Sequence, residues 1–382
     1  MAHACLLPCP YPPKVSYKRF VHFLEVYIMV LAQRFENLGD ENAFAVLARA
    51  NALKAQGHDI INLGIGQPDF RTPDVIVEAA VKALRDGAHG YTDALGIPPL
   101  REEVCQYLLK RNVHASPENI MIVPGGKVTM FFACMLLGEK GRKILYPDPG
   151  FPIYRSAAAF SGAEAVGYPL NEDDDFAPDL ERIKELVDQN TFLLIVNSPG
   201  NPTGGIMRQR HIEEIAELMR AYPNLHVMSD EIYGEMLYDG EQHVSLAAIE
   251  DVRDRVILLD GWSKTFAMTG WRLGFGMWPA HLIEAARKLS VNCHSCVSAP
   301  AQHAAITALR EGWDDVARMV VSFDERRARA AELLNAIPGV RCQIPKGAFY
   351  AFPNITDTGR KSKELAADLL EHHGLAILSG TD

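Results

Sequence analysis

The chain has 382 residues, of which 48% are hydrophobic and 23% are charged. This composition is ordinary for a globular protein, and the length is sufficient for two domains. The formal net charge of −10 argues against a nucleic-acid partner, because neutralising phosphates requires a basic surface.

The first 28 residues are expected to be an extension of doubtful structure. The run from Phe20 to Ala32 is apolar but contains Glu25, and no clear cleavage site of small residues follows it. It therefore fits a signal peptide poorly, and it is too short to span a membrane. We expect a protein without a membrane partner.

Seven cysteines are present, an odd number. Cys293 and Cys296 have the spacing of a CxxC motif, but no second such pair completes a zinc site. Reduced thiols in a cytoplasmic protein are the better interpretation, and no metal site is predicted.

Short β-rich runs alternate with helical stretches from about Val77 to Val297, which is typical of a parallel α/β sheet. Each run ends in turn residues or polar groups, and ligands of open α/β sheets bind outside the carboxyl ends of the strands. A ligand site is therefore predicted where five strands end. The predicted strands are Asn119–Val123, Lys143–Tyr146, Thr191–Val196, His226–Met228 and Val256–Leu259.

The later part of the chain is predicted to form a smaller lobe. Residues 301–335 have the amphipathic spacing of helices. Val340–Phe352, Leu375–Leu378 and the helix between them would complete the lobe.

The sequence Gly125-Gly126-Lys127 follows one predicted strand and begins a predicted helix. Glycines let the backbone approach a ligand, and the N–H groups at a helix start favour an anion. Two glycines alone more often mark a plain turn, so this signal is weak without support from elsewhere.

The segment from Asp260 to Gly274 is the most informative part of the chain. Lys264 lies just past the apolar run Val256–Leu259, where a solvated lysine would be out of place. A desolvated lysine can attack a carbonyl to form a Schiff base, and Arg272 offers a planar fork suited to a phosphate. Together they suggest pyridoxal 5′-phosphate (PLP). In isolation, a surface lysine and a structural arginine would explain the same residues.

This segment resembles the active-site lysine signature of the class I/II aminotransferases, which are PLP enzymes of fold type I. Further matching motifs begin at Gly64, and weaker likeness continues to the C-terminus. The resemblance implies a large domain with a mostly parallel seven-stranded sheet flanked by helices, and a smaller α+β domain. The implied division is 29–76 for an N-terminal arm and part of the small domain, 77–300 for the large PLP-binding domain, and 301–382 for an incomplete C-terminal small domain.

The resemblance also implies the cofactor contacts. Lys264 would carry the Schiff base, and Asp230 would keep the pyridine nitrogen protonated, since an opposite charge favours the pyridinium. A plain helix cap would be the alternative role for Asp230. The other implied contacts are Gly126 and Lys127 through their main-chain donors, Ser263 and Arg272 toward the phosphate end, Phe151 stacked on the ring, and Asn201 and Tyr233 at the phenolic oxygen.

The resemblance implies two further contacts, one with the cofactor of a neighbouring subunit and one with the substrate. Tyr91 would reach the phosphate in a neighbouring subunit, which predicts a homodimer with shared active sites. Gly66 would lie over the substrate carboxylate, although the glycines near it also fit an ordinary turn. Gly261 departs from the pattern, because many members carry a phosphate-binding serine there.

The implied activity is transfer of an amino group from an L-amino acid to a 2-oxo acid by a ping-pong mechanism. Lys264 would remove the α-proton and return it to the cofactor. A β-lyase, a decarboxylase and a truncated inactive PLP-binding product remain alternatives. Family members usually carry a carboxylate-binding arginine beyond the position of Asp382, so weak or absent activity is expected of this sequence. The identity of the amino acid stays open.

Overall fold

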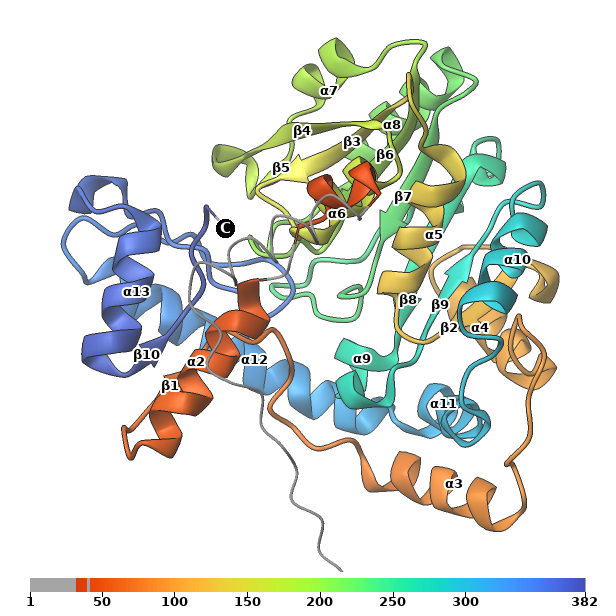
Figure 1. Cartoon of the computed structure of the whole chain (residues 1–382), viewed down its shortest axis with the longest axis horizontal. Coiled ribbons are helices and arrows are strands. Elements are labelled where there is room, and N and C mark those ends of the chain that lie inside the picture. Colours follow the sequence, from red (N-terminus) through yellow and green to blue (C-terminus); the bar gives the residue numbers. More distant parts are fainter. Residues whose placement is uncertain (1–31, 40–41, 382) are drawn as a thin grey trace, which may run out of the picture.

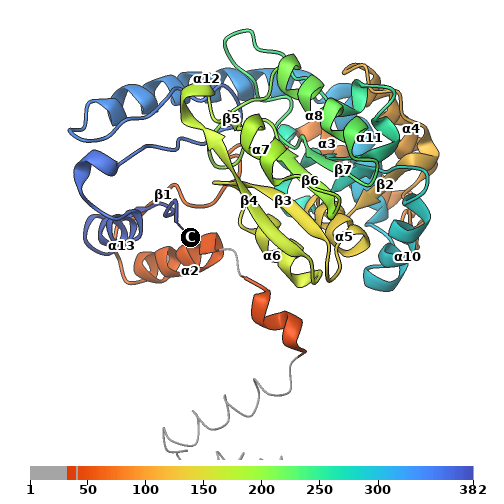
Figure 2. The ribbon, with the colours of Figure 1, turned by 90° about the horizontal axis from the view of Figure 1, so that it is seen from above.

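The computed structural model describes residues 32–39 and 42–381. The predicted extension at residues 1–28, together with Cys5 and Cys9, lies outside the described residues. Within them, the strands form one eight-stranded sheet and one two-stranded sheet. Helices cover both faces of the large sheet (Figure 1, Figure 2).

The large sheet has the strand order β2-β9-β8-β7-β6-β3-β4-β5. The pairs from β8 through β4 are parallel, whereas β9 is antiparallel to both β2 and β8, and β5 is antiparallel to β4. The strands of both sheets are β1 (Ile61–Asn62), β2 (Ile120–Val123), β3 (Lys143–Asp148), β4 (Glu164–Asn171), β5 (Ala177–Pro178), β6 (Thr191–Asn197), β7 (His226–Asp230), β8 (Val256–Gly261), β9 (Gly274–Met277) and β10 (Leu375–Ala376).

The helices vary from single turns to 23 residues. The α-helices are α2 (Asn42–Ala55), α3 (Asp74–Arg85), α4 (Pro98–Leu109), α5 (Lys127–Leu137), α6 (Ile153–Phe160), α7 (Leu180–Leu186), α8 (Gln209–Ala221), α9 (Trp262–Thr265), α10 (Ile283–Cys293), α11 (Ala299–Glu311), α12 (Trp313–Asn335) and α13 (Ser362–His373). The 3-10 helices are η1 (Gln33–Asn37), η2 (Pro117–Asn119), η3 (Glu172–Asp174), η4 (Leu246–Ala248), η5 (Arg253–Arg255), η6 (Thr269–Trp271) and η7 (Thr356–Thr358).

The central strands are apolar throughout because both of their faces are covered. Strand β2 has the sequence Ile-Met-Ile-Val, and all four residues are buried. Ile120 and Ile122 belong to one core cluster, while Met121 and Val123 belong to a second cluster on the other face. Alternate side chains of a strand point to opposite faces, so one short apolar run contributes to both cores.

The small sheet brings distant parts of the chain together. Ile61 of β1 pairs in parallel with Leu375 of β10. A separate apolar cluster beside this sheet consists of Ala50 and Leu53 from α2, Leu370 from α13 and Ala376 from β10. Figure 1 shows α2 and α13 next to each other, away from the large sheet. The proposed domain boundaries remain predictions.

The predicted mostly parallel α/β sheet is confirmed, with differences in detail. The sheet has eight strands rather than the expected seven, because the two-residue strand β5 extends its edge. The helical run at residues 301–335 is divided into α11 and α12 at Gly312. Among the described residues, no helix has both the length and the apolar character needed to cross a membrane.

Candidate active site

The predicted catalytic residues lie at the carboxyl ends of neighbouring strands. Asp230 is the last residue of β7, and Lys264 lies on α9, directly after β8. Strand β6 ends at Asn197, and the loop that follows it carries Asn201. Because these strands are parallel neighbours, their ends meet at one edge of the sheet.

The amino group of Lys264 lies among backbone and aromatic groups. Its Nζ donates a hydrogen bond to the carbonyl oxygen of Gly66. The same Nζ lies 6.0 Å from the ring centre of Tyr233 and 5.7 Å from that of Phe349. The side chain is half-buried. The lysine thus projects from the sheet edge toward the loop that was predicted to cover the substrate.

Asp230 is a buried carboxylate with both oxygens engaged. The hydroxyl of Tyr154 donates to Oδ2 at 2.7 Å, and the N–H of Ile232 donates to Oδ1 at 3.3 Å. Burial raises the pKa of Asp230 to about 6, although both hydrogen bonds favour the ionised form. A carboxylate in this position would be stabilised by a cationic group of a ligand.

Tyr233 lies against a second tyrosine that the sequence did not reveal. The hydroxyl oxygens of Tyr233 and Tyr350 are 2.6 Å apart, and burial raises the pKa of Tyr233 well above its usual range. Tyr350 also explains Gly66, because a Cβ at that glycine would lie 2.6 Å from the hydroxyl of Tyr350. Gly66 and Tyr233 therefore lie beside Lys264, and Tyr350 lies next to both of them.

The predicted phosphate cradle is built around close backbone approaches. Gly125 has a φ of +94°, and a Cβ there would lie 2.0 Å from Nη2 of Arg272. Gly126 is the N-cap of α5, and Lys127 is the first residue of that helix. The exposed guanidinium of Arg272 donates to the carbonyl of Thr269 at 2.8 Å. A helix start beside a guanidinium is suited to an anion.

The glycine at the family's serine position has a structural cause in this chain. Gly261 pairs with Gly274 across β8 and β9. A Cβ at Gly261 would lie only 2.7 Å from the Cα of Gly274, so a serine would force the two strands apart.

Phe151 lies between the cradle and Asp230. The ring centre of Phe151 is 5.1 Å from Nζ of Lys127, and its ring meets that of Tyr154 edge-on at 5.7 Å. The aromatic face predicted to stack on a ligand ring is thus supported by the tyrosine that binds Asp230.

The loop after β6 is fixed by Asn197, a residue that sequence reasoning left without a role. Its Oδ1 accepts the N–H of Asn201 at 2.8 Å, and its Nδ2 donates to the carbonyl of Asp230 at 3.0 Å. Asn197 therefore joins the loop that carries Asn201 to the end of β7.

Of the other predicted cofactor contacts, Ser263 is buried and Tyr91 is exposed. Ser263 is buried on α9, and its carbonyl accepts the N–H of Met268 at 3.1 Å. Tyr91 is 93% exposed on the loop between α3 and α4. Within the described chain, the structure does not bring Tyr91 into the aromatic contacts around Lys264.

A buried ionic cluster that sequence analysis did not predict lies near the carboxyl ends of β7 and β8. The guanidinium of Arg111 binds Oδ2 of Asp260 at 2.9 Å and Oε1 of Glu235 at 2.8 Å. It also lies 3.4 Å from Glu231, which follows Asp230 directly. Burial raises the pKa of Asp260 to about 6, against the effect of Arg111. The cluster connects the ends of β7 and β8.

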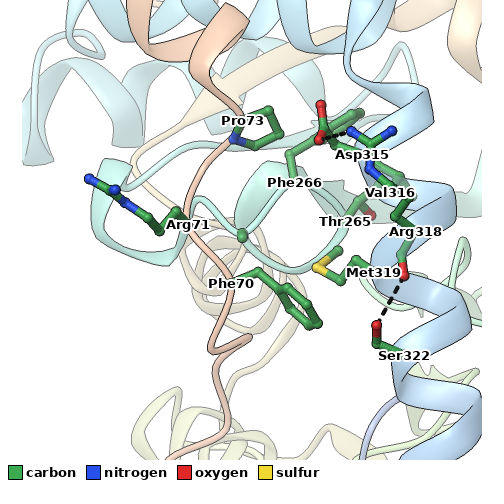
Figure 3. A pocket seen from close by; sticks show the side chains of 11 residues that line it. Phe70, Arg71, Pro73, Thr265, Phe266, Asp315, Val316, Arg318, Met319 and Ser322 are labelled. Carbon is green, nitrogen blue, oxygen red and sulfur yellow. Dashed lines mark hydrogen bonds and ion pairs between the residues drawn. The ribbon is translucent and has the colours of Figure 1, made fainter.

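A cavity of about 310 Å³ lies beside the residues that directly follow Lys264. It is bounded by the loop at Phe70–Pro73, by Thr265–Ala267 and by α12 (Figure 3). Figure 3 shows Phe70 and Met319 pointing into it, with the Asp315–Arg318 ion pair at its rim. Lys264 does not line this cavity, so we do not assign the cavity to the reaction.

Comparisons with known proteins identify the family of the chain. A family described as "Aminotransferase class I and II" matches residues 58–382. An aspartate aminotransferase of Pyrococcus horikoshii is 38% identical over 85% of this chain and 83% of its own length. The solved aromatic aminotransferase of Pyrococcus horikoshii has a TM-score of 0.82 and 36% identity, covering 87% of this chain and 90% of its own. The solved aspartate aminotransferase of Rhizobium meliloti has a TM-score of 0.87 and 29% identity, covering 92% and 91% respectively. The chain belongs to the class I and II aminotransferase family and is a PLP-dependent aminotransferase of fold type I.

Proposed function

We propose that this aminotransferase holds PLP at the edge formed by β6, β7 and β8, with Lys264 as its Schiff-base residue. The observation that carries the proposal is the position of two groups at neighbouring strand ends. The buried carboxylate of Asp230 ends β7, and the amino group of Lys264 follows β8. PLP needs an anion at its ring nitrogen and an amine at its aldehyde, so this pair fits the two ends of its ring.

The remaining residues fit the other parts of the cofactor. Gly126 and Lys127 begin α5 with donors suited to a phosphate, and Arg272 contributes its fork nearby. Phe151 offers a ring face, and Ser263 adjoins the lysine on α9. The side chains of Asn201 and Tyr233 would bind the phenolic oxygen.

When bound, PLP supplies an aldehyde that captures an amine and a ring that takes up the electron pair left at the α-carbon. The chain supplies the proton transfers. Nζ of Lys264 removes the α-proton of the substrate and later delivers a proton on the same side. Asp230, held by Tyr154, keeps the ring nitrogen protonated. Gly66 contributes the backbone that lies over the substrate carboxylate.

We propose aspartate as the first amino donor to test. The Pyrococcus horikoshii relative and the Rhizobium meliloti structure are both named aspartate aminotransferases. An aromatic amino acid is the second candidate, because the solved Pyrococcus horikoshii neighbour is named an aromatic aminotransferase.

We further propose a cytoplasmic homodimer with shared active sites. The 93% exposure of Tyr91 is what a residue that completes a neighbouring site would show in a single subunit. The described cysteines Cys105, Cys134, Cys293, Cys296 and Cys342 are free thiols, which suits a reducing compartment.

The test is a half-reaction followed by absorbance. The purified chain is loaded with PLP and mixed with aspartate, phenylalanine or alanine in turn, and the products are measured. Conversion of the cofactor to its amine form with release of the matching 2-oxo acid is expected. Release of ammonia or CO₂ without that conversion would instead indicate a lyase or a decarboxylase. Sedimentation of the loaded chain tests the dimer.

A further inference from the structure

Tyr154 contacts two parts of the proposed cofactor site although it has no place in the transfer chemistry. It lies in the first turn of α6 and is only 1% exposed. Its hydroxyl donates to Oδ2 of Asp230 at 2.7 Å. Its ring meets Phe151 at 5.7 Å with an interplanar angle of 86°. One side chain therefore contacts both Asp230, the proposed partner of the ring nitrogen, and Phe151, the proposed stacking partner of the ring.

We propose that Tyr154 is a positioning residue for PLP: its hydroxyl fixes the Asp230 carboxylate while its ring fixes the stacking angle of Phe151. The proposal rests on the proposed placement of the cofactor between Asp230 and Phe151. In addition, α6 would align the Asp230 carboxylate with the ring of Phe151 through Tyr154.

The hydroxyl of Tyr154 fixes the direction of the carboxylate. Oδ1 of Asp230 is held by the N–H of Ile232, which belongs to the chain just after β7. Oδ2 is held from α6, a separate element. With one oxygen bound from each side, the plane of the carboxylate cannot rotate without losing a hydrogen bond, and a misdirected carboxylate binds a ring nitrogen poorly.

The hydroxyl also influences the charge of Asp230. The titratable groups that face this carboxylate are Tyr154 from α6, Glu231 and Tyr233 beside β7, and Asp260 from β8. Burial opposes ionisation of Asp230, and the negative charges of Asp260 and Glu231 add to that effect. The bond from Tyr154 acts in the opposite direction, because a donor to the charged form stabilises that form.

Tyr168 provides a matched control. It is as completely buried as Tyr154, and its hydroxyl donates at 2.8 Å to the backbone carbonyl of Ile195. Tyr168→Phe removes a buried hydroxyl of the same kind without touching Asp230. A general effect of losing a buried tyrosine hydroxyl would therefore appear in both variants.

The experiment compares PLP binding by the full-length wild type, Tyr154→Phe, Tyr168→Phe, Asp230→Asn and the double variant Tyr154→Phe/Asp230→Asn. Dissociation constants are measured by titrating the cofactor-free chain with PLP on both sides of neutral pH. Tyr154→Phe is expected to bind PLP roughly tenfold more weakly at neutral pH, with its pH profile displaced upward by about one unit. Tyr168→Phe should match the wild type, and Tyr154→Phe should add little to Asp230→Asn.

Three results would overturn the proposal. The first is a pH profile of PLP affinity in Tyr154→Phe that superimposes on that of the wild type, and the second is an equal displacement of this profile in Tyr168→Phe. The third is a loss of PLP affinity on Tyr154→Phe that is as large in the Asp230→Asn background as in the wild type. If Tyr154→Phe does not fold, 3,5-difluorotyrosine at position 154 keeps the shape and donates more strongly, so the profile must move to lower pH. If the PLP placement itself is wrong, Asp230→Asn binds PLP like the wild type. Weak binding by Asp230→Asn with normal binding by Tyr154→Phe refutes only the role of Tyr154.

Discussion

Two buried aspartates lie at the carboxyl ends of neighbouring strands, Asp230 as the last residue of β7 and Asp260 as the penultimate residue of β8, yet their partners differ. Burial raises the pKa of both Asp230 and Asp260 to about 6. Asp260 binds the guanidinium of Arg111 at 2.9 Å, whereas Asp230 is bound by the neutral hydroxyl of Tyr154 at 2.7 Å. Removing the cation from a buried carboxylate leaves an uncompensated charge in the core, whereas a carboxylate held by a neutral donor can direct its charge to a ligand. The surroundings of Arg111 are thus a structural region, and those of Lys264 are the proposed reactive region.

The largest effect is expected in the reactive region. Lys264→Ala removes the amine and the proton carrier together, so turnover should fall by roughly 10⁴-fold or to background, while folding is retained. Steady-state transamination and chemical denaturation are measured on the same preparation. Lys346→Ala is the control, because that lysine pairs with Asp239 instead. Turnover by Lys264→Ala within tenfold of the wild type would refute the assignment.

In the structural region, substitution is expected to lower the free energy of unfolding. Arg111→Met leaves the buried Glu231 and Asp260, and the partly exposed Glu235, without their shared cation, so the free energy of unfolding should fall by about 3–5 kcal/mol. Urea denaturation measures the loss. Arg220→Met breaks an exposed pair with Asp251 and should leave the free energy of unfolding almost unchanged. Equal losses in the two variants would contradict the importance of the buried cluster.

Exchanging each aspartate for asparagine compares the two regions directly. Asp230→Asn should lower kcat/KM by about 10²–10³-fold, because the ring nitrogen loses its anion. Asp260→Asn should instead lower the free energy of unfolding by about 1–3 kcal/mol, with less effect on PLP affinity. The two regions are not separate in function if both variants lose activity and stability in the same proportion.

A further expected effect is a pH dependence of the cofactor-free protein. The pKa of Asp230 rises from 3.8 to about 6 on folding, so the folded state binds the proton more tightly. The resulting stabilisation is complete below about pH 4 and is lost as pH rises through 6. Relative to Asp230→Asn, the wild type should lose on the order of 2–3 kcal/mol of unfolding free energy across this window. If the free energy of unfolding varies with pH in parallel for the wild type and Asp230→Asn, Asp230 does not titrate in this way.

Local sequence was sufficient to predict the residues at the strand ends. Strands β2, β6 and β8 are apolar runs followed by polar or glycine residues, so the positions of Lys264 and Asn201 could be inferred before any contact was known. Strand β9 was not predicted, because its sequence Gly-Phe-Gly-Met lacks β-branched residues. Gly274 is needed there for packing, since a Cβ would lie 2.5 Å from the backbone nitrogen of Gly126.

The partners of the proposed catalytic residues could not be predicted because they are distant in sequence. Tyr154 precedes Asp230 by 76 residues, and Tyr350 follows Tyr233 by 117. Arg111 meets Asp260 across 149 residues. A buried tyrosine or a helical arginine has no local pattern that names its partner, so only the tertiary fold identifies these contacts.

The pairing of β1 with β10 has a consequence for the order of folding during synthesis. Leu375 follows its partner Ile61 by about 310 residues, so at roughly 5–20 residues per second β1 waits on the order of 15–60 s for the other half of its sheet. Every strand of the large sheet is made within that interval. The edge that carries Asp230 and Lys264 can therefore assemble first, and β1, the first strand of the described chain to be made, is among the last to pair.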